Sequence, residues 1–183
     1  MFELPTARLR LIALDADHLR LSLDNPERLE VNLGLHKGHA AIVGELGDAM
    51  RQMLDGVLRD PEHYLWYTHW IIVLKRSRSV AGGVCFKGPP GSSGEIEIGY
   101  GLNGEYQNRG LMTEALSEMC RWAFGEPGVS AVLAETEKAN LASQRVLHKT
   151  GFVPFRETET MLWWRLECQS ESAGAWPFSP APA

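Results

Sequence analysis

The sequence predicts an α/β (α+β) fold, a single domain with one mixed, mostly antiparallel central sheet of six to seven strands and about four flanking helices. Two observations lead to this class. Periodic segments follow in the order β, α/α, β-β-β, α, β, α, β-β, and helices interspersed with strands in this way cover the faces of one sheet. The 183 residues suffice for one core and are few for two, and 44% apolar with 22% charged residues is the composition of a globular protein.

Seven segments carry the alternation, or the β-branched and aromatic content, that is typical of strands. They are residues 8–14, 66–76, 80–87, 95–102, 131–137, 152–156 and 161–167. Short polar segments at 77–79 and 88–94 join neighbouring strands of this set, and the last two strands are also close in sequence. Connections of this kind predict hairpins.

Helical signals fill the other intervals. Helices are expected at residues 16–23, in two or three short pieces between 25 and 60, at about 110–124, and at 140–151. Asp15 and Asn140 stand where the first and last of these helices need an N-cap. Pro26 and several glycines interrupt the second region, whose best periodic segment is 40–58.

We place the folded domain at residues 1–168 and expect the Ser-, Ala- and Pro-rich segment 169–183 to be a flexible tail. The net charge of -5, with Lys and Arg scattered, argues against a nucleic-acid partner. No apolar run approaches the ~20 residues of a membrane span, and the three separated cysteines fit a reducing compartment, so we expect a cytoplasmic protein without membrane contact. His36 and His39 lack a third ligand, and no metal is expected.

The stretch 95–114 carries the clearest chemical signal. Its strand feeds a helix through a polar turn at 103–108, and the helix start at Gly110 leaves main-chain N–H groups unpaired. Such groups bind anions, and a glycine lets a phosphate approach closely, so we predict a phosphate site. Residues 99–104 also match G-x-G-x-x-G, but the dinucleotide motif needs its helix to begin inside the glycine run, and we reject it.

Several segments match one family in order and spacing. Gln107-Asn-Arg-Gly110-Leu-Met112 resembles motif A, Q/R-x-x-G-x-G/A, of the GNAT superfamily of acyl-CoA-dependent N-acyltransferases. EIGYGL with EYQNRGLMTEAL resembles the branch that contains the ribosomal-protein N-terminal acetyltransferases, as do ARLRLIALDADHL and NLASQRVLHKTGF. The resemblance covers roughly residues 6–168 and implies a GNAT-like fold. Met112 departs from motif A, and Leu147 stands where many members carry a tyrosine as general acid.

The resemblance implies acetyl-CoA as co-substrate and no metal. It implies coenzyme binding by Tyr100, Gly101, Leu102, Gln107, Asn108, Arg109, Gly110, Leu111, Met112, Thr113, Asn140 and Ser143. Within this set Asn140 would bond the pantetheine arm, although a plain N-cap explains it equally well, and Ser143 would donate a proton to the sulfur. Arg145 and Lys149 are either ligands of the outer phosphate or part of a solvated helix face.

Glu95 and Glu97 point to one face of the central strand. An amine acceptor explains carboxylates there, because at pH 7 less than about 0.1% of a lysine-like amine and about 10–20% of an α-amine is free base. We predict Glu97 as the general base, with Glu95 second, acting directly or through water. A salt bridge or an exposed edge would explain both carboxylates as well.

The predicted function is transfer of an acetyl group from acetyl-CoA to a primary amine, with a protein or peptide N-terminus as the expected acceptor. A small amine such as a polyamine, antibiotic or amino-acid derivative is one alternative, and a non-catalytic acyl-CoA-binding regulatory module is another. The aromatic residues between 64 and 70 are expected in the core, although with His36, His63 and Trp163-Trp164 they could wall an acceptor pocket. A homodimer is compatible with each alternative.

Overall fold

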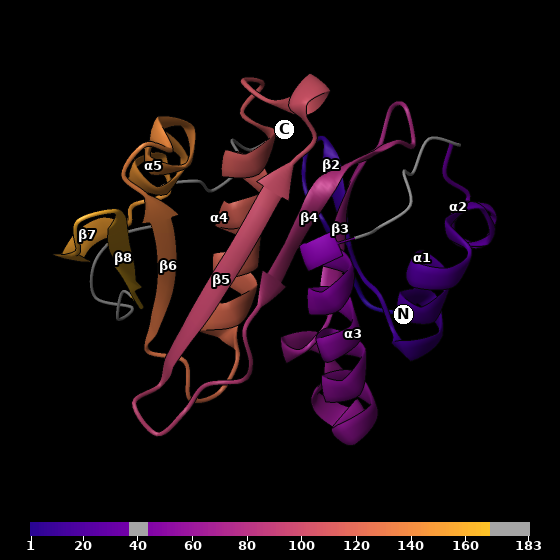
Figure 1. Cartoon of the computed structure of the whole chain (residues 1–183), viewed down its shortest axis with the longest axis horizontal. Helices are drawn as coiled ribbons and strands as arrows, with labels where there is room; N and C mark the ends of the chain where they lie inside the picture. Colours follow the sequence, from indigo (N-terminus) through magenta and orange to yellow (C-terminus); the bar gives the residue numbers. More distant parts are fainter. Residues whose placement is uncertain (37–43, 169–183) are drawn as a thin grey trace.

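The computed structural model describes residues 1–36 and 44–168, and one eight-stranded sheet runs through them in the order β1-β2-β3-β4-β5-β6-β8-β7 (Figure 1). Its strands are β1 (Glu3–Pro5), β2 (Leu9–Ala13), β3 (His69–Leu74), β4 (Val80–Phe86), β5 (Glu95–Leu102), β6 (Ala131–Glu137), β7 (Val153–Glu157) and β8 (Met161–Glu167). Neighbouring strands are antiparallel except β5 and β6, which are parallel. The predicted mixed, mostly antiparallel sheet is therefore confirmed.

The sheet has one strand more than the six to seven predicted, and the addition is β1. Its three residues are too few to show a period of two, and Pro5 is a poor strand residue, yet the strand pairs with β2 from Glu3 to Pro5. The strand predicted at 66–76 begins only at His69. The 3-10 helix η1 (Pro61–Trp66) occupies the residues before it.

Helices cover both faces of the sheet. Within the described ranges they are α1 (Ala16–Asp24), α2 (Pro26–Leu33), α3 (Gly44–Arg59), α4 (Leu111–Gly125), α5 (Leu141–Lys149) and the short 3-10 helix η2 (Gly104–Tyr106). The region after Asn25 forms the two separate helices α2 and α3, as its proline and glycine residues predicted. Asn25 caps the start of α2, and Gly34 ends it in the left-handed conformation with φ of 63°.

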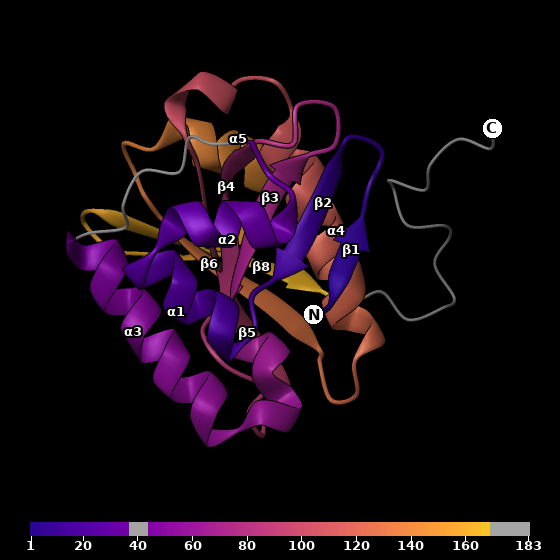
Figure 2. The same cartoon turned by 90° about the vertical axis from the view of Figure 1, so that its right-hand side faces the viewer.

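The two faces of the sheet bury separate cores (Figure 2). Helices α1, α2 and α3 pack on one face, where Ile12 and Ile71 of β2 and β3 point toward them. Helix α4 packs on the other face, over Leu11 and Ile72. Adjacent residues of one strand thus enter different cores, as the period of two in a strand requires.

Aromatic side chains fill the core beneath α4. The ring of Trp122 lies 4.7 Å from that of Trp66, 5.3 Å from that of Trp70 and 5.6 Å from that of Phe86, measured between centroids. Contacts of this kind add about 0.5–1.5 kcal/mol each to the burial of the rings. Trp66 and Trp70 therefore act in packing, which confirms the expectation of aromatic core residues in this stretch.

Strands β5 and β6 separate part-way along their length (Figure 1). Their pairing covers only residues 95–97 opposite 131–133. Beyond that point β5 stays with β4 up to Leu102, while β6 stays with β8 up to Glu137. The sheet therefore opens into a V whose arms are the ends of β5 and β6.

His39, one of the two histidines from which no metal site was expected, and the tail predicted at 169–183 lie outside the described ranges. Among the helices that the structure describes, none combines the length and apolar character needed to cross a bilayer.

Candidate active site

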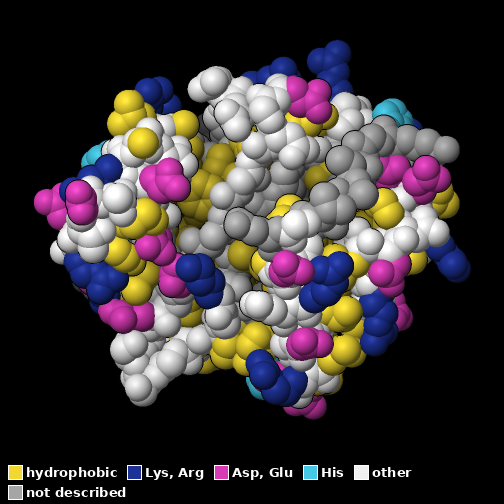
Figure 3. Space-filling model, in the orientation of Figure 1, with side chains coloured by type: hydrophobic (Ala, Val, Ile, Leu, Met, Phe, Trp, Pro, Cys, Tyr) yellow, Lys and Arg dark blue, Asp and Glu magenta, His cyan; other side chains and the backbone are white. Residues whose placement is uncertain are grey.

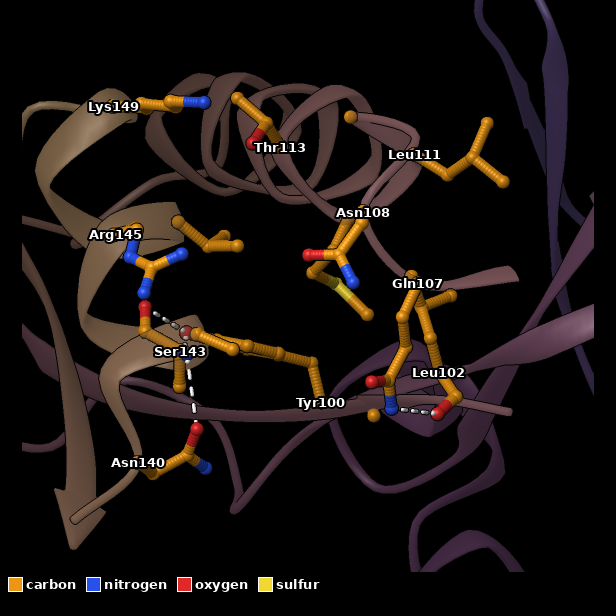
Figure 4. A pocket seen from close by; sticks show the side chains of 15 residues that line it. Tyr100, Leu102, Gln107, Asn108, Leu111, Thr113, Asn140, Ser143, Arg145 and Lys149 are labelled. Carbon is orange, nitrogen blue, oxygen red and sulfur yellow. Dashed lines mark hydrogen bonds between the residues drawn. The ribbon is translucent and has the colours of Figure 1, made fainter. Parts of the chain in front are cut away.

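A cavity of about 410 Å³ lies between the end of β5, the start of α4 and the helix α5 (Figure 4). It is lined by Tyr100, Gly101, Leu102, Gln107, Asn108, Gly110, Leu111, Met112, Thr113, Asn140, Ala142, Ser143, Arg145, Val146 and Lys149. The residues predicted to bind the coenzyme all line this cavity except Arg109. The guanidinium of Arg109 lies 5.9 Å from the centroid of the Tyr106 ring instead.

Helix α4 presents an uncapped N-terminus to this first cavity. Gly110 is its N-cap residue, in the left-handed conformation with φ of 70°, and no side chain of the described residues caps the helix there. The first helical bond runs from the N–H of Glu114 to the carbonyl of Gly110 at 3.2 Å. The N–H groups of residues 111–113 therefore have no partner within the helix and, at the positive end of its dipole, favour an anion.

Local contacts hold the turn before α4 in shape. Gln107 Nε2 donates to the carbonyl of Leu102 at 3.1 Å, which closes the turn onto the end of β5 (Figure 4). Asn108 is left-handed, with φ of 60°, a conformation that asparagine tolerates. Met112 is only 5% exposed and belongs to the core beneath α4. Much of the bulk by which Met112 departs from motif A is therefore packed in the core.

Helix α5 forms the opposite wall and supplies two cations, Arg145 and Lys149. They are four residues apart, so both side chains lie on one face of the helix (Figure 4). Ala142 and Val146 line the cavity as well, although the sequence analysis did not single them out. The spacing of four and three from Ala142 through Val146 to Lys149 is the helical repeat that could have found them.

Hydrogen bonds connect β5 to α5 across the first cavity. The Tyr100 hydroxyl lies 2.7 Å from Ser143 Oγ, and either oxygen can be the donor (Figure 4). Asn140 Oδ1 accepts from the Ser143 N–H at 3.0 Å, so Asn140 is the N-cap of α5. Burial raises the pKa of Tyr100 to about 12, although the hydrogen bond with Ser143 opposes this. The phenol is therefore neutral at physiological pH and can donate a hydrogen bond.

Leu147, which stands at the position of the family's tyrosine, has no solvent exposure and belongs to the core beneath α4. It does not line the first cavity. A phenol is nevertheless present there, because Tyr100 brings one from β5. The sequence predicted Tyr100 as a coenzyme contact but carried no signal for its hydrogen bond with a residue 43 positions away.

A second cavity of about 340 Å³ lies beside the opening between β5 and β6. It is lined by Lys87, Glu97, Ile98, Gly99, Glu135, Thr136, Glu137, Asn140 and Met161. Asn140 lines both cavities, so the two meet at this residue. Figure 3 shows the surface hollowed between the arms of the V, with acidic side chains beside the hollow. Three carboxylates and one lysine make the second cavity attractive to cations.

The two carboxylates predicted on β5 have different surroundings. Glu97 lines the second cavity and forms an ion pair with Lys87. Glu95 forms an ion pair with Arg165, which also pairs with Glu167. Glu95 lines neither of the two cavities.

Aromatic and metal-binding alternatives find little support at this site. Neither Trp66 nor Trp163 lines a cavity described above, and the ring of Trp163 is covered by the Arg156 guanidinium at 4.0 Å. In the part of the chain that the structure describes, no cluster of three or more His, Cys, Asp or Glu side chains is placed to hold a metal ion.

A sheet that opens between two parallel strands, an uncapped helix start facing two cations, and an acidic cavity across the opening form a site that could hold an anionic ligand beside a cationic one. The sequence matches the acetyltransferase (GNAT) domain family over residues 8–153, which is most of the chain. The chain therefore belongs to the GNAT family of acetyl-CoA-dependent acetyltransferases.

Curated relatives match part of the chain. The uncharacterized N-acetyltransferase YjdG of Bacillus subtilis is 38% identical over 87 residues, which cover 48% of this chain and 52% of that protein. The uncharacterized N-acetyltransferase YnaD of the same organism is 34% identical over 55 residues, covering 30% of this chain and 32% of that protein. The chain thus matches about half of the first relative and about a third of the second.

Solved structures resemble the fold over nearly the whole chain. The ribosomal-protein-S5-alanine acetyltransferase from Vibrio fischeri superimposes with a TM-score of 0.70 at 17% identity, covering 94% of this chain and 100% of that one. RimL, a ribosomal L7/L12 alpha-N-protein acetyltransferase solved in complex with coenzyme A, gives a TM-score of 0.64 at 15% identity, covering 91% and 98%. At these identities the likeness establishes the fold alone.

Proposed function

We propose that this chain transfers the acetyl group of acetyl-CoA to a primary amine, and that the amine is the N-terminus of a protein or peptide. The observation that supports this most is the meeting of two unlike cavities at Asn140. One offers donors and cations to an anionic coenzyme, and the other offers carboxylates to an amine. A transferase gains its rate from holding donor and acceptor in contact at one point.

The first cavity suits coenzyme A. Its pyrophosphate would lie at the N–H groups of residues 111–113, where the helix dipole contributes about 0.3–1 kcal/mol. Arg145 and Lys149 would face the outer phosphate from α5. The pantetheine arm would pass Asn140 and bring the thioester between β5 and β6, near Tyr100 and Glu135.

In the reaction that we propose, the lone pair of the amine attacks the thioester carbonyl carbon. Glu97 takes a proton from the amine, directly or through water. Main-chain N–H groups near Gly101 and Leu102 stabilise the oxyanion. The carbon–sulfur bond then breaks, and the leaving thiolate receives a proton from Ser143, whose Oγ lies beside the Tyr100 hydroxyl. Water returns a proton to Ser143 and takes one from Glu97, so that the net products are the amide and the thiol. Glu97 already pairs with the ammonium group of Lys87, so this carboxylate is placed to hold a cation of the acceptor's kind.

The shape of the second cavity favours a peptide as acceptor. Its lining is charged and lies at a surface hollow, whereas a closed aromatic pocket would favour a small amine (Figure 3). Trp66 and Trp163, the residues that could have closed such a pocket, do not line it. Two proteins of the same fold are named as acetyltransferases of ribosomal proteins, which agrees with this choice.

A polyamine is the second candidate, because Glu97, Glu135 and Glu137 outnumber the one lysine of the second cavity. A small molecule with two or more ammonium groups could pair with several of these carboxylates at once. We also propose a cytoplasmic location, which the free thiols of Cys85, Cys120 and Cys168 support.

Release of free thiol from acetyl-CoA tests these proposals. The acceptors are peptides with a free N-terminus, the same peptides with a blocked N-terminus and one internal lysine, and spermidine. We expect release with the free N-terminus and background release with the blocked peptide. Faster release with spermidine would favour the second candidate. Thermal stabilisation by coenzyme A without release for any acceptor would favour a non-catalytic module and contradict the proposal.

A further inference from the structure

Arg8 links the beginning of β2 to the turn before α4. Its Nε donates to Glu114 Oε2 at 2.6 Å, and its main-chain N–H donates to Glu114 Oε1 at 2.7 Å. Its Nη1 donates to the main-chain carbonyl of Arg109 at 2.9 Å. One arginine thus contacts both the first turn of α4 and the peptide just before the N-cap residue, more than 100 positions away in sequence.

The bond to the Arg109 carbonyl fixes the direction of the next N–H group. The structure has no cis peptide among its described residues, and in a trans peptide the carbonyl of Arg109 and the N–H of Gly110 point in opposite directions. Because Arg8 holds the carbonyl on its own side, the Gly110 N–H points away from Arg8. A Cβ built on Gly110 would lie 3.6 Å from Arg8 Nη2, so the guanidinium lies against one side of the turn, and Gly110 also lines the first cavity.

Arg8 neutralises the negative charge of Glu114, which lies near the predicted pyrophosphate site. Its carboxylate is in the first turn of α4, beside the N–H groups at which a pyrophosphate would bind, and an unpaired charge there would repel the phosphates. Thr6 Oγ1 and Arg8 both donate to this carboxylate, whose side chain is only 17% exposed. Burial alone would raise the pKa of Glu114, but the hydrogen bonds from Thr6 and Arg8 lower it overall, so the group stays ionised and paired.

We propose that Arg8 is a positioning residue for the coenzyme: it orients the peptide before α4 and neutralises Glu114, so that the turn accepts a pyrophosphate. The inference rests on the proposed function, since it needs coenzyme A in the first cavity. If the contacts of Arg8 served the fold alone, removing them would lower the stability of the protein and would weaken the binding of every ligand equally. A positioning role changes affinity for ligands that carry a pyrophosphate.

The test compares Arg8→Gln with Arg10→Gln. Arg10 lies two residues further along the chain and also pairs with a glutamate, because its Nε and Nη2 donate to the two carboxylate oxygens of Glu3 of β1, both at 2.8 Å. Calorimetric titration with coenzyme A is expected to show a Kd at least tenfold higher for Arg8→Gln, and a Kd within about twofold of the unaltered chain for Arg10→Gln. Titration with pantetheine, which lacks the pyrophosphate, should give a clearly smaller loss for Arg8→Gln.

Two further variants test the same proposal. Arg8→Lys needs only the unaltered chain for comparison, so it keeps the proposal open to refutation if Arg8→Gln does not fold. Arg8→Lys retains a positive charge but cannot hold Glu114 and the Arg109 carbonyl together, so an intermediate Kd is expected. Arg8→Gln combined with Glu114→Gln removes the carboxylate that Arg8→Gln alone leaves without its cation, and should recover at least threefold of the lost affinity.

Equal losses for coenzyme A and pantetheine, or a lower melting temperature with unchanged affinity, would overturn the role of Arg8. The proposed function fails separately, if the unaltered chain does not bind coenzyme A.

Discussion

At the scale of single residues, Glu97 and Glu95 share one face of β5 but differ in what they contact. Glu97 reaches the second cavity, where Lys87 is its partner. Glu95 is paired with Arg165 of β8. The same substitution at these two positions therefore separates an effect on acetyl transfer from an effect on sheet stability.

Glu97→Gln is expected to lower turnover most at acidic pH, because free amine is scarcest there and a general base matters most. General bases contribute about 10²–10⁴-fold to rate, so a loss on the order of 10² is expected near pH 6, with a smaller loss toward pH 9. The measurement is the initial rate of thiol release against pH at saturating acetyl-CoA.

Glu95→Gln is the matched control, and its pH–rate profile should keep the shape found for the unaltered chain. A Glu97→Gln profile of unchanged shape would place the base elsewhere.

Tyr100→Phe is expected to lower kcat about tenfold while leaving the Kd for coenzyme A within a factor of about two, because only the hydroxyl beside Ser143 is lost. With its pKa raised to about 12, the phenol stays protonated below about pH 11, so the loss should be constant between about pH 6 and 9. Pre-steady-state rates and calorimetry measure the two quantities.

If Tyr100 acts through Ser143, the double variant Tyr100→Phe with Ser143→Ala should be no slower than Ser143→Ala alone, since residues that act as a unit are not additive. Fully additive losses would refute the coupling.

At the scale of elements, α4 combines a buried face with a free N-terminus. Residues such as Ala115, Leu116 and Met119 bury one side of the helix completely, while the turn that precedes it lines the first cavity. A change at the turn can therefore alter the N-terminal N–H groups and leave the packing of the helix intact.

Gly110→Glu is expected to weaken coenzyme A binding at least tenfold, or about 1.4 kcal/mol, because it puts a negative charge at the predicted pyrophosphate site. The control is Gly110→Asn, since asparagine tolerates the left-handed φ of 70° and adds no charge. Calorimetry should give Gly110→Asn the smaller loss. If Gly110→Glu binds coenzyme A as tightly as the unaltered chain, the phosphate site is not at this turn.

Elements whose signals are local were predictable. The caps at Asp15 and Asn140, and the interruptions at Pro26 and Gly34, depend on a few neighbouring residues, so the sequence located most helices and strands. The turn before α4, which is predicted to bind phosphate, was located in the same way, from its place between a strand and a helix. The short strand β1 was missed because three residues carry no period.

Contacts between distant segments were not predictable. The hydrogen bonds of Glu114 with Arg8, and of Tyr100 with Ser143, join residues 106 and 43 positions apart. No local pattern specifies such pairs, since they follow from the sheet order and the packing of α4 and α5. The partners of Glu95 and Glu97 could not be predicted for the same reason. Arg165, the partner of Glu95, is on β8, two strands from β5 in the sheet, and Lys87, the partner of Glu97, directly follows β4.

At the scale of the whole molecule, the candidate site lies where two neighbouring strands of the sheet separate. Strands β5 and β6 pair only over residues 95–97 and 131–133, and the part of the sheet from β6 to β7 is joined to the rest at this seam (Figure 1). A coenzyme in the first cavity would contact β5 and the start of α4 on one side and α5 on the other. Binding of the coenzyme should therefore stabilise the junction between β5 and β6 directly.

Coenzyme A is accordingly expected to stabilise the chain and to do so unevenly. At a concentration one hundred times its Kd, a ligand adds about 2.7 kcal/mol to the free energy of unfolding. For a chain of this size that corresponds to a rise of roughly 5–10 °C in melting temperature. Hydrogen exchange should show new protection at the turn 107–113 and at the start of α5, and little at α1 and α2, which pack on the opposite face of the sheet.

Gly110→Glu serves as the control, because a tenfold higher Kd lowers the stabilisation at the same coenzyme concentration to about 1.4 kcal/mol. The shift in melting temperature should therefore fall to about half or less, and the protection should weaken with it. Protection confined to α1 and α2 would place the coenzyme away from the V. A shift in melting temperature with protection at the turn but none at α5 would mean that the coenzyme is held by one arm only, and that Arg145 and Lys149 do not contact it.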